Sequence, residues 1–185
     1  YNCLDKIVRQ KSLNKVGDTY YIWPYKGEFR KLLLEYKNNS RLALGKIISS
    51  LIEEEIFKVV YEEDIDYIVP IPINFRREQI RGFNQVEEIL KNLNYSFLKT
   101  NRVKNTKKMF KILDKEKREN NIKNSFKVDK EFKAKNILIF DDIITTGATI
   151  EEFKRELIKN GEVNKIVVFS LSASKTYMNS NKRMC

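Results

Sequence analysis

The sequence contains no histidine, only two cysteines, three prolines and six glycines among its 185 residues. Without histidine, the chain lacks the usual acid–base group at neutral pH and the commonest metal ligand. This excludes serine–histidine–aspartate hydrolysis and histidine-based metal catalysis by this chain. Cys3 and Cys185 lie near opposite ends with no CxxC spacing, which fits neither a disulfide framework nor a self-contained zinc site. We therefore expect a reduced, cytoplasmic protein.

Long apolar runs are also lacking. No stretch approaches the roughly 20 apolar residues that a membrane-spanning helix needs, so we expect no membrane insertion. Hydrophobic residues make up 42% of the chain and charged residues 33%, which is enough to bury the core of one ordinary domain. The net charge of +11 indicates attraction to phosphates in nucleotides, nucleic acid or a membrane surface, although it also fits a bias toward lysine.

Two amphipathic helices are predicted near the N-terminus. Between Glu28 and Lys37, and again between Arg41 and Phe57, apolar residues recur at the spacing of one helix face. A third helix is predicted around Val86 to Leu93. A fourth begins near Ala148 or Thr149 and ends near Asn160-Gly161.

Buried strands alternate with these helices. We predict strands over Tyr67 to Pro72, Tyr95 to Lys99, Asn136 to Phe140 and Lys165 to Phe169, with a basic loop after the first. Because strands and helices alternate, we expect an α/β fold: an open, mostly parallel sheet with flanking helices.

The segment from Arg102 to Lys135 differs from the rest of the chain. It holds 13 Lys and Arg against 5 Asp and Glu, with scattered apolar residues. We predict a long loop with a short helix around Asp114 to Asn121. It is either a functional lid or a solvated charged face.

The most informative stretch is Ile137-Leu138-Ile139-Phe140-Asp141-Asp142-Ile143-Ile144-Thr145-Thr146-Gly147-Ala148-Thr149. An apolar strand leads to two carboxylates, and small hydroxyl residues and a glycine then open a helix. Gly147 allows backbone N–H groups to converge on an anion, and the threonines add hydroxyl donors. Two carboxylates beside a phosphate would repel it unless they bind sugar hydroxyls or a metal-bound water. A phosphorylated ribose fits this stretch, because it offers a phosphate to the N–H groups and sugar hydroxyls to the carboxylates.

This string resembles the phosphoribosyl-pyrophosphate motif of type I phosphoribosyltransferases. The resemblance implies that Asp141 and Asp142 hold the ribose hydroxyls. It also implies that Thr145, Thr146, Gly147, Ala148 and Thr149 hold the 5′-phosphate, with Mg²⁺ carried by phosphoribosyl pyrophosphate and no direct metal ligand in the protein.

A second resemblance narrows the family. Val69-Pro70-Ile71-Pro72, Arg76-Arg77 and Arg81-Gly82-Phe83-Asn84-Gln85 are similar to the VPVP, RR and RGFNQ signature of the ComF family. Tyr25 to Arg30 with Lys37 resembles that family's YxGxLR and LK segment, and Arg118, Asn121 and Phe126 fall at the spacing of its RxxN and AF segment. The similarity extends from about Tyr25 to Ser172.

The loop after the first core strand is expected to lie beside the phosphate cradle. Arg76, Arg77, Arg81 and Gly82 are therefore candidates for binding pyrophosphate, since a guanidinium grips phosphate oxygens in pairs. The alternative is a solvated turn. Phe83, Asn84 and Gln85 either serve the site or only cap and pack a helix.

The resemblance implies a hood region at residues 1–58, made of the remnant of a truncated zinc-finger segment plus two helices, and a phosphoribosyltransferase-like domain at residues 59–185. Family members commonly carry a four-cysteine zinc finger, and here only Cys3 could belong to one. Either the finger lies upstream or this member has lost it. Met109 also stands where the family's TxxQ element, here Thr106 to Met109, has glutamine.

The leading hypothesis is a ComF-like protein that binds phosphoribosyl pyrophosphate and acts in DNA uptake or single-stranded DNA processing, in the company of a competence helicase. If it is an enzyme, a phosphoribosyltransferase, then Asp141, Asp142 and Arg77 carry catalysis and the segment from Thr106 to Arg118 excludes water. One rival is a metabolic phosphoribosyltransferase acting on a nucleobase or amine. Another is a non-catalytic single-stranded nucleic-acid-binding module with a vestigial site, in which Phe110 and Phe126 stack on bases.

Overall fold

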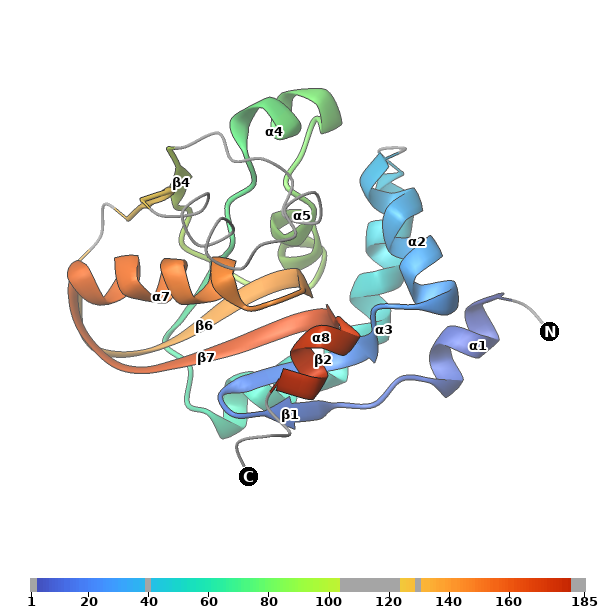
Figure 1. The fold of residues 1–185 in the computed structure, drawn as a ribbon, viewed down its shortest axis with the longest axis horizontal. Helices are drawn as coiled ribbons and strands as arrows, with labels where there is room; N and C mark the ends of the chain where they lie inside the picture. The colour runs from blue at the N-terminus through green and yellow to red at the C-terminus, as the bar shows by residue number, and fades with distance from the viewer. Residues whose placement is uncertain (1–2, 39–40, 104–123, 129–130, 181–185) are drawn as a thin grey trace.

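The computed structural model describes residues 3–38, 41–103, 124–128 and 131–180. They form a five-stranded sheet covered by helices on both faces (Figure 1). The helices are α1 (Cys3–Arg9), α2 (Gly27–Asn38), α3 (Leu42–Glu62), α4 (Phe75–Arg81), α5 (Gln85–Asn92), α7 (Ala148–Lys159) and α8 (Lys175–Ser180). The strands are β1 (Asn14–Val16), β2 (Thr19–Pro24), β3 (Tyr67–Pro70), β4 (Asn101–Arg102), β5 (Phe126–Lys127), β6 (Phe132–Ile144) and β7 (Gly161–Ala173).

The strand order in the main sheet is β1-β2-β7-β6-β3, and every neighbouring pair except β1 with β2 is parallel. This confirms the predicted open, mostly parallel α/β fold. The carboxyl ends of β3, β6 and β7 meet at one edge, the edge at which α/β sheets bind ligands. A separate two-stranded sheet joins β4 to β5.

Two apolar clusters fill the two sides of the sheet. The first holds residues of α2, α3 and α5 against the even-numbered side chains Leu138 and Phe140 of β6. The second holds residues of α7 and β5 against the odd-numbered Ile137 and Ile139. Successive side chains of a strand point to opposite faces, which explains this division between Ile137 and Phe140. Past the acidic pair the order changes, because Ile143 packs against the first cluster and Ile144 belongs to the second.

The predicted amphipathic helices form as expected. Helix α2 buries Phe29, Leu33 and Tyr36 on one face, and α3 extends five residues past the predicted end at Phe57. Residues 1–58 also contribute β1 and β2 to the main sheet, which helical periodicity did not predict. The division of the chain at residue 58 stays a prediction.

Three local predictions are wrong. The strand expected from Tyr95 to Lys99 does not form; Tyr95 and Phe97 pack against the first cluster and Leu98 against the second, so the chain crosses the sheet edge here. The basic loop after β3 is instead the helix α4. The strand expected to end at Phe140 continues as β6 to Ile144, so both carboxylates lie inside a strand.

The short helix predicted at Asp114 to Asn121 lies outside the described residues. In the described segments, none of the helices is both long and apolar enough to cross a bilayer. Cys3 is exposed and forms no disulfide.

Candidate functional site

The acidic pair sits at the carboxyl end of β6, and its two members have different surroundings. Asp142 follows Phe140 on the side of α2 and α5, and its side chain is buried. Asp141 directly follows the buried Phe140 and is itself half-buried. The Oδ1 atom of Asp141 accepts the backbone N–H of Asp142 at 2.8 Å. Adjacent carboxylates therefore have separate surroundings.

Asp142 is held by two partners, the partly buried Lys37 and the buried Gln85. The ammonium of Lys37, from the last turn of α2, lies 2.6 Å from Asp142 Oδ2. The amide nitrogen of Gln85, the first residue of α5, donates to the same oxygen at 2.5 Å. These contacts tie the expected hood helix to the centre of the sheet.

The surroundings of Asp141 disfavour its ionised form. Burial, and next the neighbouring charge of Asp142, raise the pKa of Asp141 to about 7, although the Asp142 backbone N–H, Lys37 and Arg102 act in the other direction. A carboxyl group in such surroundings takes up a proton at a higher pH than an exposed one, and added positive charge nearby favours its ionised form.

The loop after β6 has the predicted shape of an anion cradle. Gly147 adopts φ 82° and ψ −13°, a left-handed conformation, directly before the first residue of α7. Thr145 is exposed, while the remaining residues of the loop through Thr149 are partly buried. The hydroxyl of Ser174 donates to the carbonyl of Thr145 at 2.6 Å. Backbone N–H groups at the start of a helix are suited to bind a phosphate.

Tyr177 supports this cradle from α8. A side-chain carbon placed on Gly147 would lie 3.2 Å from the Tyr177 ring. The Tyr177 hydroxyl donates to Thr19 Oγ1 at 2.9 Å, and its backbone N–H donates to the Ser174 hydroxyl. Neither Tyr177 nor Ser174 belongs to a motif in the sequence, because their role depends on the packing of a distant segment.

The candidate pyrophosphate residues lie on α4, which begins just after β3. The side chain of Asn74 caps this helix by accepting the backbone N–H of Arg76 at 3.0 Å. Gly82 ends it in a left-handed conformation, with φ 84°. Arg76 is exposed, whereas Arg77 and Arg81 are partly buried. The arginines are therefore carried by a capped helix rather than by an irregular turn.

Three arginines near the acidic pair, Arg77, Arg81 and Arg102, interact electrostatically with one another or with the two carboxyl groups. Burial lowers the pKa of Arg81. The charge of Asp142 opposes this shift, and the charge of Arg77 adds to it. Burial likewise lowers the pKa of Arg102 to about 10, with Arg77 acting in the same direction and Asp141 against it. The sequence analysis did not assign Arg102 to the site. Its guanidinium also lies 5.3 Å from the ring centre of Phe126.

We call the following six residues the charge cluster: Lys37, Arg77, Arg81, Arg102, Asp141 and Asp142. The cluster brings four basic side chains together with two carboxyl groups, one of which, Asp141, has its pKa raised to about 7. Like charges packed together in a partly buried site destabilise one another. An anion would relieve this repulsion.

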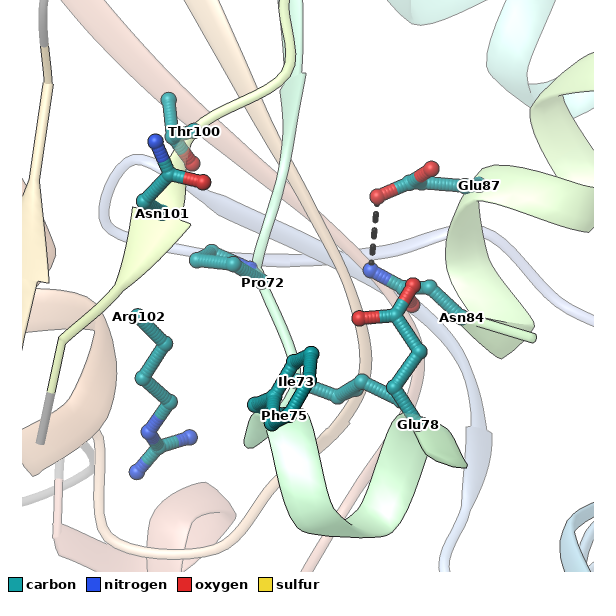
Figure 2. A pocket seen from close by; sticks show the side chains of 9 residues that line it. All are labelled: Pro72, Ile73, Phe75, Glu78, Asn84, Glu87, Thr100, Asn101 and Arg102. Carbon is teal, nitrogen blue, oxygen red and sulfur yellow. Dashed lines mark hydrogen bonds between the residues drawn. The ribbon is translucent and has the colours of Figure 1, made fainter. Parts of the chain in front are cut away.

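A small pocket of about 100 Å³ adjoins the charge cluster at Arg102 (Figure 2). Figure 2 shows it between the start of α4, the start of α5 and β4, with Pro72, Ile73 and Phe75 as its apolar members. The Asn84 amide, at its wall, donates to Glu87 at 3.1 Å. The remaining lining residues are Glu78, Thr100 and Asn101.

The RGFNQ segment divides into structural and site residues. Asn84 caps α5 by accepting the Val86 N–H at 3.2 Å, and Phe83 lies against Tyr36 with ring centres 5.4 Å apart. Both fit the capping and packing interpretation. Gln85, in contrast, contacts Asp142.

Several expected residues do not enter the described site. Phe126 is buried and meets Phe153 edge to face at 4.9 Å, so it is a core residue rather than a stacking platform for bases. Arg118, Asn121, Phe110 and the segment from Thr106 to Arg118 lie outside the described residues. In the ranges that the structure describes, we find no group of three or more Cys, Asp or Glu side chains arranged to hold a metal ion.

The state of Asp141 gives a pH prediction. Its pKa is about 7 in the folded chain and about 3.9 in an unfolded one, so its stabilising effect is complete below about pH 4 and is lost as the pH rises through 7. We expect Asp141→Asn to be more stable than the wild type at pH 8 by at least about 1 kcal/mol, the equivalent of one pKa unit. The difference should shrink at pH 4.5. Urea unfolding at the two pH values measures it, and an equal difference at both would contradict the shift.

Comparison with known proteins gives matches over most of the chain. The PRTase-CE family model matches residues 27–184. The chain is similar to the DNA utilization protein YhgH of Escherichia coli K12, at 26% identity over 168 residues that cover 86% of this chain and 71% of YhgH. It is also similar to the competence protein ComFC of Streptococcus pneumoniae R6, at 30% identity over 161 residues (81% of this chain, 66% of ComFC).

A second ComFC, that of Bacillus subtilis 168, is 31% identical over 124 residues, which cover 64% of this chain and 49% of that protein. The relatives therefore carry sequence beyond the matched part. These matches confirm the expected resemblance to the ComF family.

Proposed function

Because the chain belongs to the PRTase-CE family, we propose that it binds phosphoribosyl pyrophosphate together with Mg²⁺ at the carboxyl edge of β6. The observation that carries the proposal is the charge cluster, which brings four basic side chains together with two carboxyl groups. The cradle at Gly147 would receive the 5′-phosphate. Arg77, Arg81 and Arg102 would meet the pyrophosphate, with Arg76 at the rim of the site.

The acidic pair fits the sugar of such a ligand. Ribose hydroxyls donate hydrogen bonds, and an ionised carboxylate accepts them. Asp141 would gain most, because a ligand-bound cation or a hydroxyl donor favours its ionised form. Mg²⁺ is usually bound through substrate phosphates and one or two carboxylates, so this donor set fits it, and when bound it would neutralise pyrophosphate charge.

If the chain is an enzyme, the reaction is displacement at ribose C1. The bond from C1 to the pyrophosphate oxygen breaks, the electron pair leaves with pyrophosphate, and an acceptor forms the new bond to C1. Arg77 and its neighbours would stabilise the departing charge, and Asp141 and Asp142 would orient the ribose.

The cellular setting that we propose is the use or uptake of DNA. The support is similarity to proteins named for DNA utilization and for competence. Single-stranded DNA and a competence helicase are the partners that this setting would supply. The net charge of +11 agrees with a polyanion near the protein.

Pyrophosphate binding tests the arginine half of the site. We expect Arg77→Met to weaken the binding of pyrophosphate with Mg²⁺ by about 10-fold to 100-fold, the worth of one hydrogen bond to a charged group. Arg9→Met, which removes the same charge from the exposed surface of α1, should change it less than twofold. Calorimetric titration gives both constants. Equal losses in the two variants would mean that only overall charge attracts the ligand.

A further inference from the structure

Gln85 occupies a fixed and buried position between the two halves of the site. It is the first residue of α5, and 6% of its surface is exposed. Its backbone carbonyl accepts the Tyr36 hydroxyl at 3.0 Å, and Tyr36 is fully buried. The main chain of Gln85 is therefore anchored to α2, independently of what its side chain does.

The side-chain amide of Gln85 uses both of its ends. Its oxygen accepts a hydrogen bond from the guanidinium of Arg81, at the end of α4. Its nitrogen donates to Asp142 Oδ2 at 2.5 Å. An amide offers an acceptor and donors on one planar group. A carboxylate here would repel Asp142, and an ammonium would repel Arg81, so the position favours an amide of this length.

We infer that Gln85 is the positioning residue that joins the pyrophosphate half of the site to the ribose half. Arg81 belongs to the first half and Asp142 to the second, and Gln85 fixes both side chains through one rigid group. The inference rests on the proposed function, because that function assigns the two halves to two parts of one ligand.

Two small probes separate the halves experimentally. Pyrophosphate with Mg²⁺ has no ribose, and ribose 5-phosphate has no pyrophosphate. We expect Gln85→Met, which keeps the length and burial of the side chain, to weaken the binding of each probe by about 10-fold, equal to about 1.4 kcal/mol. Arg81→Met should weaken pyrophosphate binding much more than ribose 5-phosphate binding. Only a residue that serves both halves affects both probes.

Two controls exclude a purely structural effect. Ile89→Val removes a methylene from a fully buried residue of the same helix and should cost roughly 0.5–1.5 kcal/mol of stability. It should leave both affinities within twofold. Gln79→Met makes the same substitution at an exposed position of α4 and should change neither stability nor affinity.

A second measurement uses only the wild-type chain, so it does not depend on whether a variant folds. In the wild-type chain, the side-chain amide signals of Gln85 in a nitrogen–proton NMR spectrum should shift when either probe is added alone. If one of the probes leaves both amide signals of Gln85 unmoved, the inference is wrong.

The outcomes separate the two proposals. If the wild type binds both probes and Gln85→Met weakens neither or only one, the inference is wrong and the proposed function stands. If the wild type binds neither probe, the proposed function fails, and the role of Gln85 fails with it.

Discussion

Replacing Lys37 with methionine is expected to lower the free energy of unfolding at pH 7 by about 3 kcal/mol. Lys37 and Asp142 lie 2.6 Å apart, with 14% and 8% of their side chains exposed. Methionine keeps the apolar stem but leaves the Asp142 charge buried without its cation. Removing one partner of a buried pair costs more than the pair itself contributes, because desolvation of the remaining charge is no longer offset.

The same helix supplies a matched control. Lys31 forms an ion pair with Glu28 at 3.0 Å, but 69% of its side chain is exposed. Lys31→Met should cost less than about 1 kcal/mol, as exposed pairs do. The double variant Lys37→Met/Asp142→Leu should recover most of the loss, since it leaves no buried charge without a partner. Urea unfolding measures the free energy of unfolding of the wild type and of all three variants. Equal effects of Lys37→Met and Lys31→Met would show that the Lys37 pair is not buried as described.

Alanine at position 147 is expected to abolish most ribose 5-phosphate binding, with at least a 30-fold loss of affinity, about 2 kcal/mol. Two causes act together. The left-handed φ of 82° is strained for any residue with a side-chain carbon, and that carbon would lie 3.2 Å from the Tyr177 ring. Because the loop must move to relieve either strain, its N–H groups would no longer converge on one phosphate.

Gly17 provides the comparison for this substitution. Its φ is 60°, and a side-chain carbon there would meet nothing within 4 Å. Gly17→Ala should therefore lose about 1 kcal/mol of stability from backbone strain alone, with unchanged ligand binding. Thermal unfolding and calorimetry of the two variants separate backbone strain from damage to the cradle. If Gly147→Ala binds ribose 5-phosphate like Gly17→Ala, the loop is not the phosphate site.

Local patterns predicted much of this architecture because they depend on nearby residues. The spacing of apolar residues in α2 and α3 predicted two helices. The run of apolar residues before Asp141 predicted a central strand of a mostly parallel sheet. The glycine at position 147 predicted a turn before a helix, and the helix does begin there. Each of these signals is complete within about ten residues of sequence.

The remaining features depend on contacts between distant segments. Ser170 of β7 pairs with Asp141 along the sheet, and this pairing extends β6 through the acidic residues. The extension gives Asp141 and Asp142 different surroundings, which composition alone does not reveal. Lys37 is 105 positions from Asp142. Arg102, whose pKa Asp141 affects, lies on β4, which is held in place by its pairing with β5.

The RGFNQ segment illustrates the same limit. Its sequence left open whether Asn84 and Gln85 cap a helix or serve a site. The structure separates two adjacent residues, since Asn84 caps α5 while Gln85 reaches Asp142. Which role each takes depends on the direction in which α5 leaves the edge of the sheet.

The central claim is that the charge cluster binds a phosphorylated ribose that carries pyrophosphate. Calorimetric titration of phosphoribosyl pyrophosphate into the wild-type chain, with and without Mg²⁺, tests it most directly. We expect saturable binding at one site per chain that is tighter with Mg²⁺ and lost in Asp141→Asn/Asp142→Asn. Absence of heat with the folded wild-type chain at millimolar ligand, or equal binding by the double variant, would contradict the claim.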